Sequence, residues 1–136
     1  QPNVSTIETM EEAEKPAESP VLDTVSALEL LDGDTSILHT LLPIVLEQMS
    51  ADRREIAAAI SSKDADRVKK ISHRLKGSVG QIGAVRAHRA CELLEAAAAN
   101  GDSATLVDFQ RSLNTELDAL SPAIKTYIAL HPHPES

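Results

Sequence analysis

Residues 65–80 read ADRVKKISHRLKGSVG, and this stretch decides the fold class because its apolar residues recur at helical spacing. At about 100° per residue, four apolar side chains fall into one stripe about 40° wide. The four are Val68, Ile71, Leu75 and Val79. His73 lies about 160° from the centre of that stripe, so we expect its ring to point away from the core.

The sequence on both sides of this stretch is also helical in period. We predict a short helix from Asp23 or Thr24 to Gly33, a long helix from Asp34 or Thr35 to a turn at residues 61–64, helices over 65–80 and 84–99, and a last helix from Asp102 or Ser103. Pro43 and Pro122 fall inside the two longest patterns, where each should kink or break its helix. The predicted fold is all-α, an antiparallel up-down four-helix bundle with a short extra N-terminal helix.

A chain of 136 residues is long enough for one domain with one core. We assign residues 1–20 to a flexible acidic linker rich in Pro and Glu, 21–130 to the bundle, and 131–136 to a disordered tail. The first residue is Gln1 rather than Met, so we expect the chain to be cut from a longer protein. No signal peptide or membrane span is recognisable, and we expect a cytoplasmic location without direct membrane contact.

The net charge of −8 disfavours nucleic acid as a partner, because non-specific nucleic-acid binders are usually basic. The basic residues are nevertheless concentrated, since eight of the 13 lie in residues 63–89 with only two acidic ones. They are Lys63, Arg67, Lys69, Lys70, Arg74, Lys76, Arg86 and Arg89. Such an island predicts a localised anionic partner, although a solvated helix face explains most runs of this kind.

Cys91 is the only cysteine, which excludes a disulfide framework and a cysteine-based zinc cluster. We interpret Cys91 as a small buried apolar residue. No metal site and no cofactor is expected. The chain also lacks a strand followed by a glycine-rich phosphate loop, so we expect no ATP site of its own.

The neighbours of His73 suit phosphoryl chemistry. Lys76 and Gly77 stand at i+3 and i+4, where side chains stack beside His73, and Gly80 lies about 20° from the same direction. Helical glycines cost roughly 1 kcal/mol each relative to Ala, so we interpret both as clearance for an approaching protein. Fraying at the helix end is the alternative for Gly80. A neutral imidazole is a good nucleophile near neutral pH, and Lys76 can pair with phosphoryl oxygens.

The run HRLKGSVGQIGA (73–84), followed by CELLE (91–95), resembles the histidine-containing phosphotransfer (HPt) domain family of phosphorelays. Looser agreement extends upstream through LELLDGD (28–34), so that the resemblance covers roughly residues 22–125. It implies that His73 is phosphorylated, that Lys76 partners the phosphoryl group and that Gly77 is the clearance position. Glu95 stands where the family often has a Gln or Glu that accepts a hydrogen bond from the other ring nitrogen. A plain surface carboxylate is the alternative for Glu95.

The resemblance further implies a multistep two-component phosphorelay. His73 would accept a phosphoryl group from an aspartate of one receiver domain and pass it to another, with Mg²⁺ supplied by the receiver. We expect a monomeric module at the C-terminal end of a hybrid sensor histidine kinase, which could itself be membrane-bound. Leu28, Leu31 and Leu38 are candidates for the docking surface, although core packing explains each of them equally well. Val45 departs from the family, which often carries Phe there.

Of three competing interpretations, Arg74 excludes the first and the other two stay open. An autokinase dimerisation helix also exposes a histidine, but it typically has an acidic residue next, where this chain has Arg74. The phosphotransfer domain of a chemotaxis kinase has nearly the same local motif, and a non-catalytic docking bundle would need no chemistry at all. His39 and His88 lack the Lys-Gly pair that follows His73, and His131 and His133 fall in the predicted tail.

Overall fold

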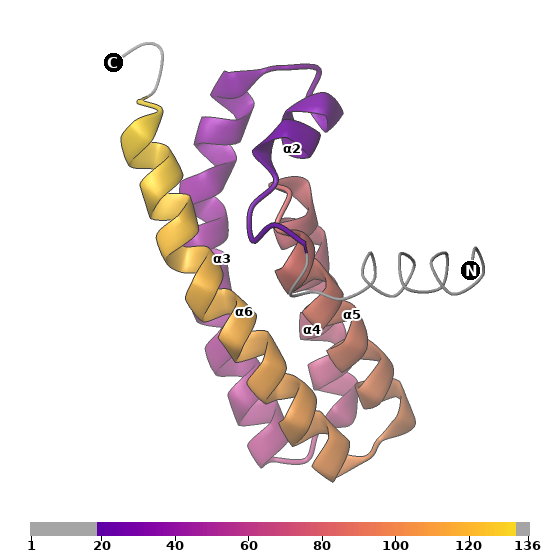
Figure 1. Ribbon diagram of the computed structural model, residues 1–136. Coiled ribbons are helices and arrows are strands. Elements are labelled where there is room, and N and C mark those ends of the chain that lie inside the picture. Colours follow the sequence, from indigo (N-terminus) through magenta and orange to yellow (C-terminus); the bar gives the residue numbers. More distant parts are fainter. Residues whose placement is uncertain (1–18, 133–136) are drawn as a thin grey trace, which may run out of the picture.

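The computed structural model describes residues 19–132 as five helices (Figure 1). They are α2 (Thr24–Leu30), α3 (Thr35–Ser61), α4 (Ala65–Gln81), α5 (Val85–Asn100) and α6 (Ser103–Leu130). The described residues contain no strand, which confirms the all-α prediction. Most of the predicted linker, residues 1–18, and the end of the predicted tail, residues 133–136, lie outside the described part of the chain.

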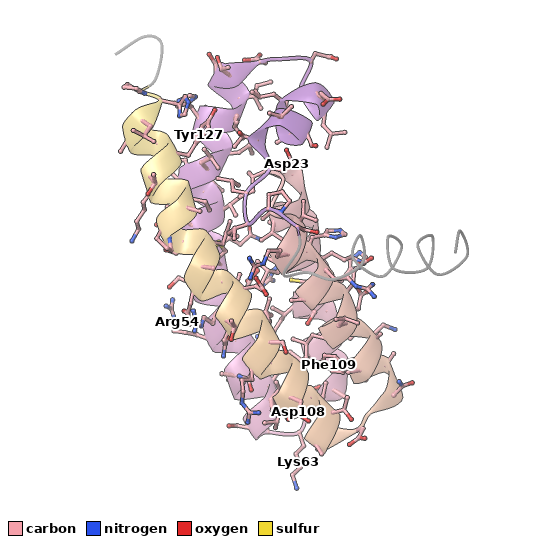
Figure 2. The ribbon with its side chains drawn as sticks, in the orientation of Figure 1. Asp23, Arg54, Lys63, Asp108, Phe109 and Tyr127 are labelled. Carbon is pink, nitrogen blue, oxygen red and sulfur yellow. The ribbon has the colours of Figure 1, made fainter. Side chains whose placement is uncertain are left out.

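The four long helices form an antiparallel up-down bundle in which each packs on its neighbours in a closed ring, α3 on α4, α4 on α5, α5 on α6 and α6 on α3. Figure 2 shows the two ends, with Asp23 and Tyr127 near one and Lys63, Asp108 and Phe109 near the other. Every apolar residue predicted for the α4 stripe is buried in the shared core. The bundle thus leaves the opposite face of α4 for other uses.

Aspartates begin four of the five helices. Asp23, Asp34, Asp64 and Asp102 each accept a hydrogen bond from a backbone N–H of the first turn. This satisfies donors that have no partner within the helix. Where the sequence left two candidate caps, the structure therefore selects the aspartate each time. Gly101, in the left-handed conformation with φ 72°, ends α5 as predicted.

Neither internal proline breaks its helix. α3 continues through Pro43 and α6 through Pro122, so the predicted alternative of a break or split is wrong at both positions. Both prolines are exposed, so their rings lie on the solvent side of the helices and not in the core. The apolar stripes on the opposite sides of both helices remain buried.

α2 packs across the end of the bundle at which α4 turns into α5. The backbone N–H of Asp23 donates to the carbonyl of Gly83 at 2.7 Å. Gly83 has φ 79°, and a Cβ there would lie only 2.0 Å from the carbonyl oxygen of Asp23. Glycine is therefore required in this turn both by its conformation and by the close approach of the α2 backbone.

α6 ends at Leu130, where the sequence analysis placed the end of the bundle, and the described chain continues into the predicted tail. His131 is the C-cap of α6, its ring stacks on Tyr127 with centroids 4.2 Å apart, and its carbonyl oxygen faces Nε2 of His39 on α3. The expectation of an unstructured tail is thus wrong for His131, and His133 lies outside the described residues. No helix in residues 19–132 combines the length and the apolar character needed to cross a lipid bilayer.

Candidate functional site

His73 projects from the solvent face of α4. Its side chain is 69% exposed, although the residue before it, Ser72, and Leu75 two residues later are fully buried. The helical period produces this contrast, because a side chain nearly opposite the apolar stripe cannot reach the core. The ring is therefore accessible to another macromolecule.

Glu95 on α5 holds the ring. Its Oε2 lies 2.9 Å from Nδ1 of His73, and its Oε1 lies 2.8 Å from Nζ of Lys76. The Lys76 ammonium, together with the hydrogen bond from His73, holds the pKa of the Glu95 carboxyl below its usual range. The same contact raises the pKa of Lys76. One ionised carboxylate therefore joins both residues that the sequence analysis singled out on α4.

The contact with Glu95 determines which ring nitrogen of His73 carries the proton. An ionised carboxylate can only accept hydrogen bonds, so Nδ1 of His73 carries the proton. In the neutral ring Nε2 then keeps its lone pair, and no residue in 19–132 forms a hydrogen bond with it. Fixing one nitrogen as a donor is a common way to prepare the other as a nucleophile or ligand.

The two glycines near His73 play different parts. Gly77 is exposed, and a Cβ built on it would meet nothing within 4 Å, so the space beside the ring is open there. A Cβ at Gly80 would lie 3.1 Å from Cδ2 of His88. The interpretation of Gly80 as clearance for a partner is therefore wrong, because the ring of His88 on α5 already occupies that space.

Most of the basic island is paired within the described part of the chain. Arg67 and Arg74 contact Glu55, Lys76 contacts Glu95, Arg86 contacts Glu116 and Arg89 contacts Glu92. Lys63, Lys69 and Lys70 form no ion pair within residues 19–132, and only the last two are close to His73 along α4. The positive charge that an anion would meet at the ring is thus smaller than the sequence count implies.

An open hollow of about 530 Å³ lies beside the ring. Its lining residues are Asp66, Lys69, Lys70, His73 and Glu95. The two lysines therefore bring unpaired positive charge to the wall of this hollow.

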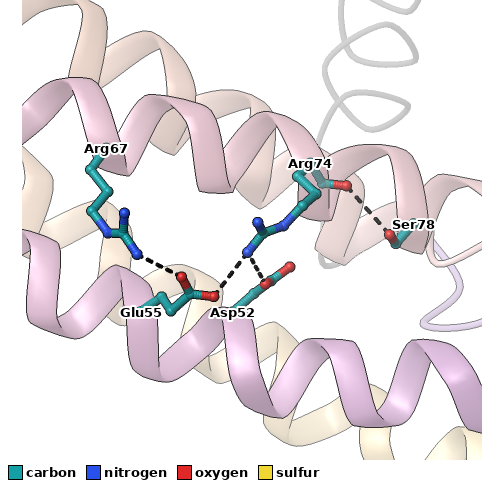
Figure 3. A network of polar contacts seen from close by, with 5 residues as sticks. All are labelled: Asp52, Glu55, Arg67, Arg74 and Ser78. Carbon is teal, nitrogen blue, oxygen red and sulfur yellow. Dashed lines mark hydrogen bonds and ion pairs between the residues drawn. The ribbon is translucent and has the colours of Figure 1, made fainter.

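The sequence analysis missed Asp52, a buried carboxylate on α3. Its side chain is 2% exposed and pairs with Arg74, which also contacts Glu55 at 3.0 Å (Figure 3). Glu55 in turn accepts from Arg67 at 2.7 Å. Asp52 stands in the apolar register of α3, between Met49 and Ile56, and this misplaced charge was the signal that could have found it.

The remaining candidates fall outside this site. Cys91 is fully buried, which confirms its interpretation as a small buried apolar residue, and burial raises the pKa of its thiol to about 12. In residues 19–132, no group of three or more His, Cys, Asp or Glu side chains is placed to hold a metal ion. Of the predicted docking leucines, Leu38 is fully buried and Leu28 and Leu31 pack against the core, so these predictions give way to core packing.

Comparisons with known proteins agree with this arrangement. The family model described as Hpt domain matches residues 40–123. Among solved structures, the crystal structure of histidine-containing phosphotransfer protein B (HptB) from Pseudomonas aeruginosa PAO1 is similar, with a TM-score of 0.76 and 21% sequence identity over 83% of this chain and 98% of that one. At this identity the likeness establishes the fold alone. No curated protein matches the sequence.

Proposed function

This chain belongs to the Hpt domain family, and from that premise we propose that His73 accepts a phosphoryl group from a receiver-domain aspartate and passes it to a second receiver. The observation that carries the proposal is the exposed ring whose Nδ1 is held 2.9 Å from Glu95. This contact leaves Nε2 as the nucleophile. Family membership confirms the resemblance drawn from the sequence around His73, and histidine phosphotransfer is the corresponding activity.

The transfer step balances on these groups. The Nε2 lone pair of His73 attacks phosphorus, the bond between phosphorus and the aspartyl oxygen breaks, and the aspartate leaves as a carboxylate. Nδ1 keeps its proton, so the phosphorylated ring carries a positive charge next to the carboxylate of Glu95. That carboxylate therefore stabilises the product and the transition state that leads to it. The reverse step returns the phosphoryl group to another aspartate.

We assign the Mg²⁺ of this reaction to the receiver domain. The neighbourhood of His73 offers Asp66 and Glu95, and Glu95 is already engaged by Lys76. A hard divalent cation needs several oxygen ligands, which this pair does not provide. The module therefore acts as a phosphocarrier that contributes a nucleophile, and its partner contributes the metal.

We place receiver docking on the groove between α2 and the turn from α4 to α5. It is lined mainly by apolar atoms of Ala27, Leu30, Gly80, Gly83, Ala84, Val85 and His88, with Ser26 at its edge. Gly80 lies two helical turns beyond His73 on nearly the same face of α4. Leu30 is 75% exposed and Val85 39% exposed, so the groove has apolar side chains to bury against a partner near the ring.

We further propose that the module acts as a monomer at the C-terminal end of a hybrid sensor kinase. The acidic, proline-rich composition of residues 1–20 supports this position, because such a tether lets one module reach several receivers.

The test is transfer from a phosphorylated receiver domain. The expected result is a label on this chain that is labile in acid and stable in base, as for phosphohistidine, and that disappears in His73→Gln. His39→Gln serves as the matched control, because it removes another helical histidine that lies outside the hollow and the groove. Label that persists in His73→Gln would show that another residue carries the phosphoryl group.

A further inference from the structure

On α4, the hollow beside His73 is lined by three residues that precede the ring, Asp66, Lys69 and Lys70. Side chains on a helix lean toward its N-terminus, so the His73 ring covers the turn that precedes it. Lys69 and Lys70 are the residues at i−4 and i−3 in that turn, and both line the hollow. A phosphoryl group on the exposed ring therefore lies about one helical turn from the side chains of these two lysines.

Lys76 is placed differently. Its ammonium is bonded to Oε1 of Glu95 at 2.8 Å, its side chain is only 24% exposed, and it does not line the hollow. Turning Lys76 toward a phosphoryl group would break this bond and leave Glu95, which is 20% exposed, with one partner fewer while it orients the ring. Lys69 and Lys70 need break no ion pair within residues 19–132 to reach an anion.

The charge around the hollow also favours Lys69 and Lys70 over Lys76 as the residues that contact a phosphoryl group. Asp66 and Glu95 are the acidic residues of its lining, and Lys69 and Lys70 are the basic ones. Glu95 is balanced by Lys76 from outside the hollow, which leaves one positive charge in excess. A phosphoryl group with nearly two negative charges is thus attracted to the lysine side of the ring.

We propose that Lys69 and Lys70 make the cationic contacts with the phosphoryl group on His73, and that Lys76 is a positioning residue that acts through Glu95. This proposal rests on the proposed function, and it reassigns the phosphoryl contact that the family resemblance gave to Lys76. Two flexible ammonium groups on exposed stems can follow the phosphoryl group as it moves between the aspartyl oxygen and Nε2.

The test uses phosphoramidate, a small donor that needs no docking surface. Nε2 of His73 attacks its phosphorus, the P–N bond of the donor breaks and ammonia leaves. We expect the double variant Lys69→Gln/Lys70→Gln to accept the phosphoryl group about tenfold more slowly, because charge-assisted contacts to the transferring group are lost. Lys125→Gln on α6, an exposed lysine with no ion pair in the described residues, is the control and should react at the wild-type rate.

A second readout separates direct contact from positioning. ³¹P NMR titration of the phosphorylated chain follows the pKa of the phosphoryl oxygens, which neighbouring cations lower. We expect that pKa to rise in the double variant and to change little in Lys76→Gln, which should instead alter the ¹⁵N signals of the His73 ring. The proposal is overturned if the double variant matches Lys125→Gln, or if Lys76→Gln alone raises the phosphoryl pKa. If the His73→Gln variant is still phosphorylated, the proposed function itself is wrong.

Discussion

Arg74, the residue that follows His73, forms an ion pair with Asp52, a carboxylate of α3 that is only 2% exposed. The pair links α4 to α3 one residue away from His73. One oxygen of Asp52 has no hydrogen-bond partner in the described residues, so the buried charge depends heavily on Arg74.

Replacing Arg74 should therefore be costly. We expect Arg74→Met to lower the free energy of unfolding by about 2 kcal/mol, less than for a fully buried pair because the Arg74 side chain is 50% exposed. Arg53→Met is the control, since the Arg53–Asp118 pair is largely exposed and should contribute less. Urea unfolding of both variants checks the difference, and equal losses would show that Asp52 tolerates burial without Arg74.

Substitutions of Glu95 should reduce phosphotransfer by His73 in proportion to the contacts that they remove. In Glu95→Gln the amide oxygen can still accept from Nδ1, but the ion pair with Lys76 is lost, whereas Glu95→Ala removes both contacts. We expect the alanine variant to transfer phosphate roughly tenfold more slowly, with the glutamine variant in between. ¹⁵N NMR of His73 should show both tautomers in Glu95→Ala and mainly the Nδ1–H form in wild type. A wild-type transfer rate in Glu95→Ala would remove Glu95 from the mechanism.

Gly77 predicts opposite changes in stability and activity. Gly77→Ala should raise the free energy of unfolding by about 0.5–1 kcal/mol, because the added methyl group meets only open space and alanine favours the helix. The same methyl group should slow transfer from a receiver, and Gly77→Leu should slow it further. Gly80→Ala is the comparison, since its methyl group must displace His88 and should give a smaller gain in stability. Undiminished transfer in Gly77→Leu would contradict the clearance role.

His39, beside Tyr127 near the start of α3, predicts a pH dependence of stability. The backbone carbonyls of His131 and Thr35 raise its pKa, because both favour a ring with two N–H donors. A raised pKa stabilises the fold fully below the unfolded value near 6.5, and this contribution is lost as the pH rises through the folded pKa. Thermal unfolding should therefore show a loss of stability from pH 6 to pH 8 that is reduced in His39→Gln. Parallel pH profiles would show that the ring does not respond to these carbonyls.

The sequence predicts best what a helix determines locally. The aspartate caps, the glycine stop at Gly101 and the outward direction of His73 all follow from short spacings, and the structure reproduces them. Apart from the breaks expected at Pro43 and Pro122, the errors concern contacts between helices. Gly80 looked like empty space along α4, but His88 of α5 fills it. Asp52 looked like one more polar residue until the bundle placed it against Arg74, some 20 residues away in sequence.

The contact of Glu95 with His73 was predicted, but not from the helical spacing. Its distance of 22 residues from His73 gave no local reason to pair them, and only the family resemblance suggested the contact that the structure contains. The pairing depends on the packing of α5 against α4, which no single helical period encodes. The positioning role that we propose for Lys76 has the same origin, because its contact with Glu95 is visible only once both helices are in place.

The turn at Gly83 has a consequence for protein engineering. It sets the register of α4 against α5, and thereby of the ring against its carboxylate, while its backbone is tied to Asp23. A chimera that receives only α4, the Gly83 turn and α5 would lack the segment around Asp23, whose backbone is hydrogen-bonded to this turn. The smallest transferable segment therefore runs from Asp23 through Glu95, and exchanges between such modules should be cut outside those limits.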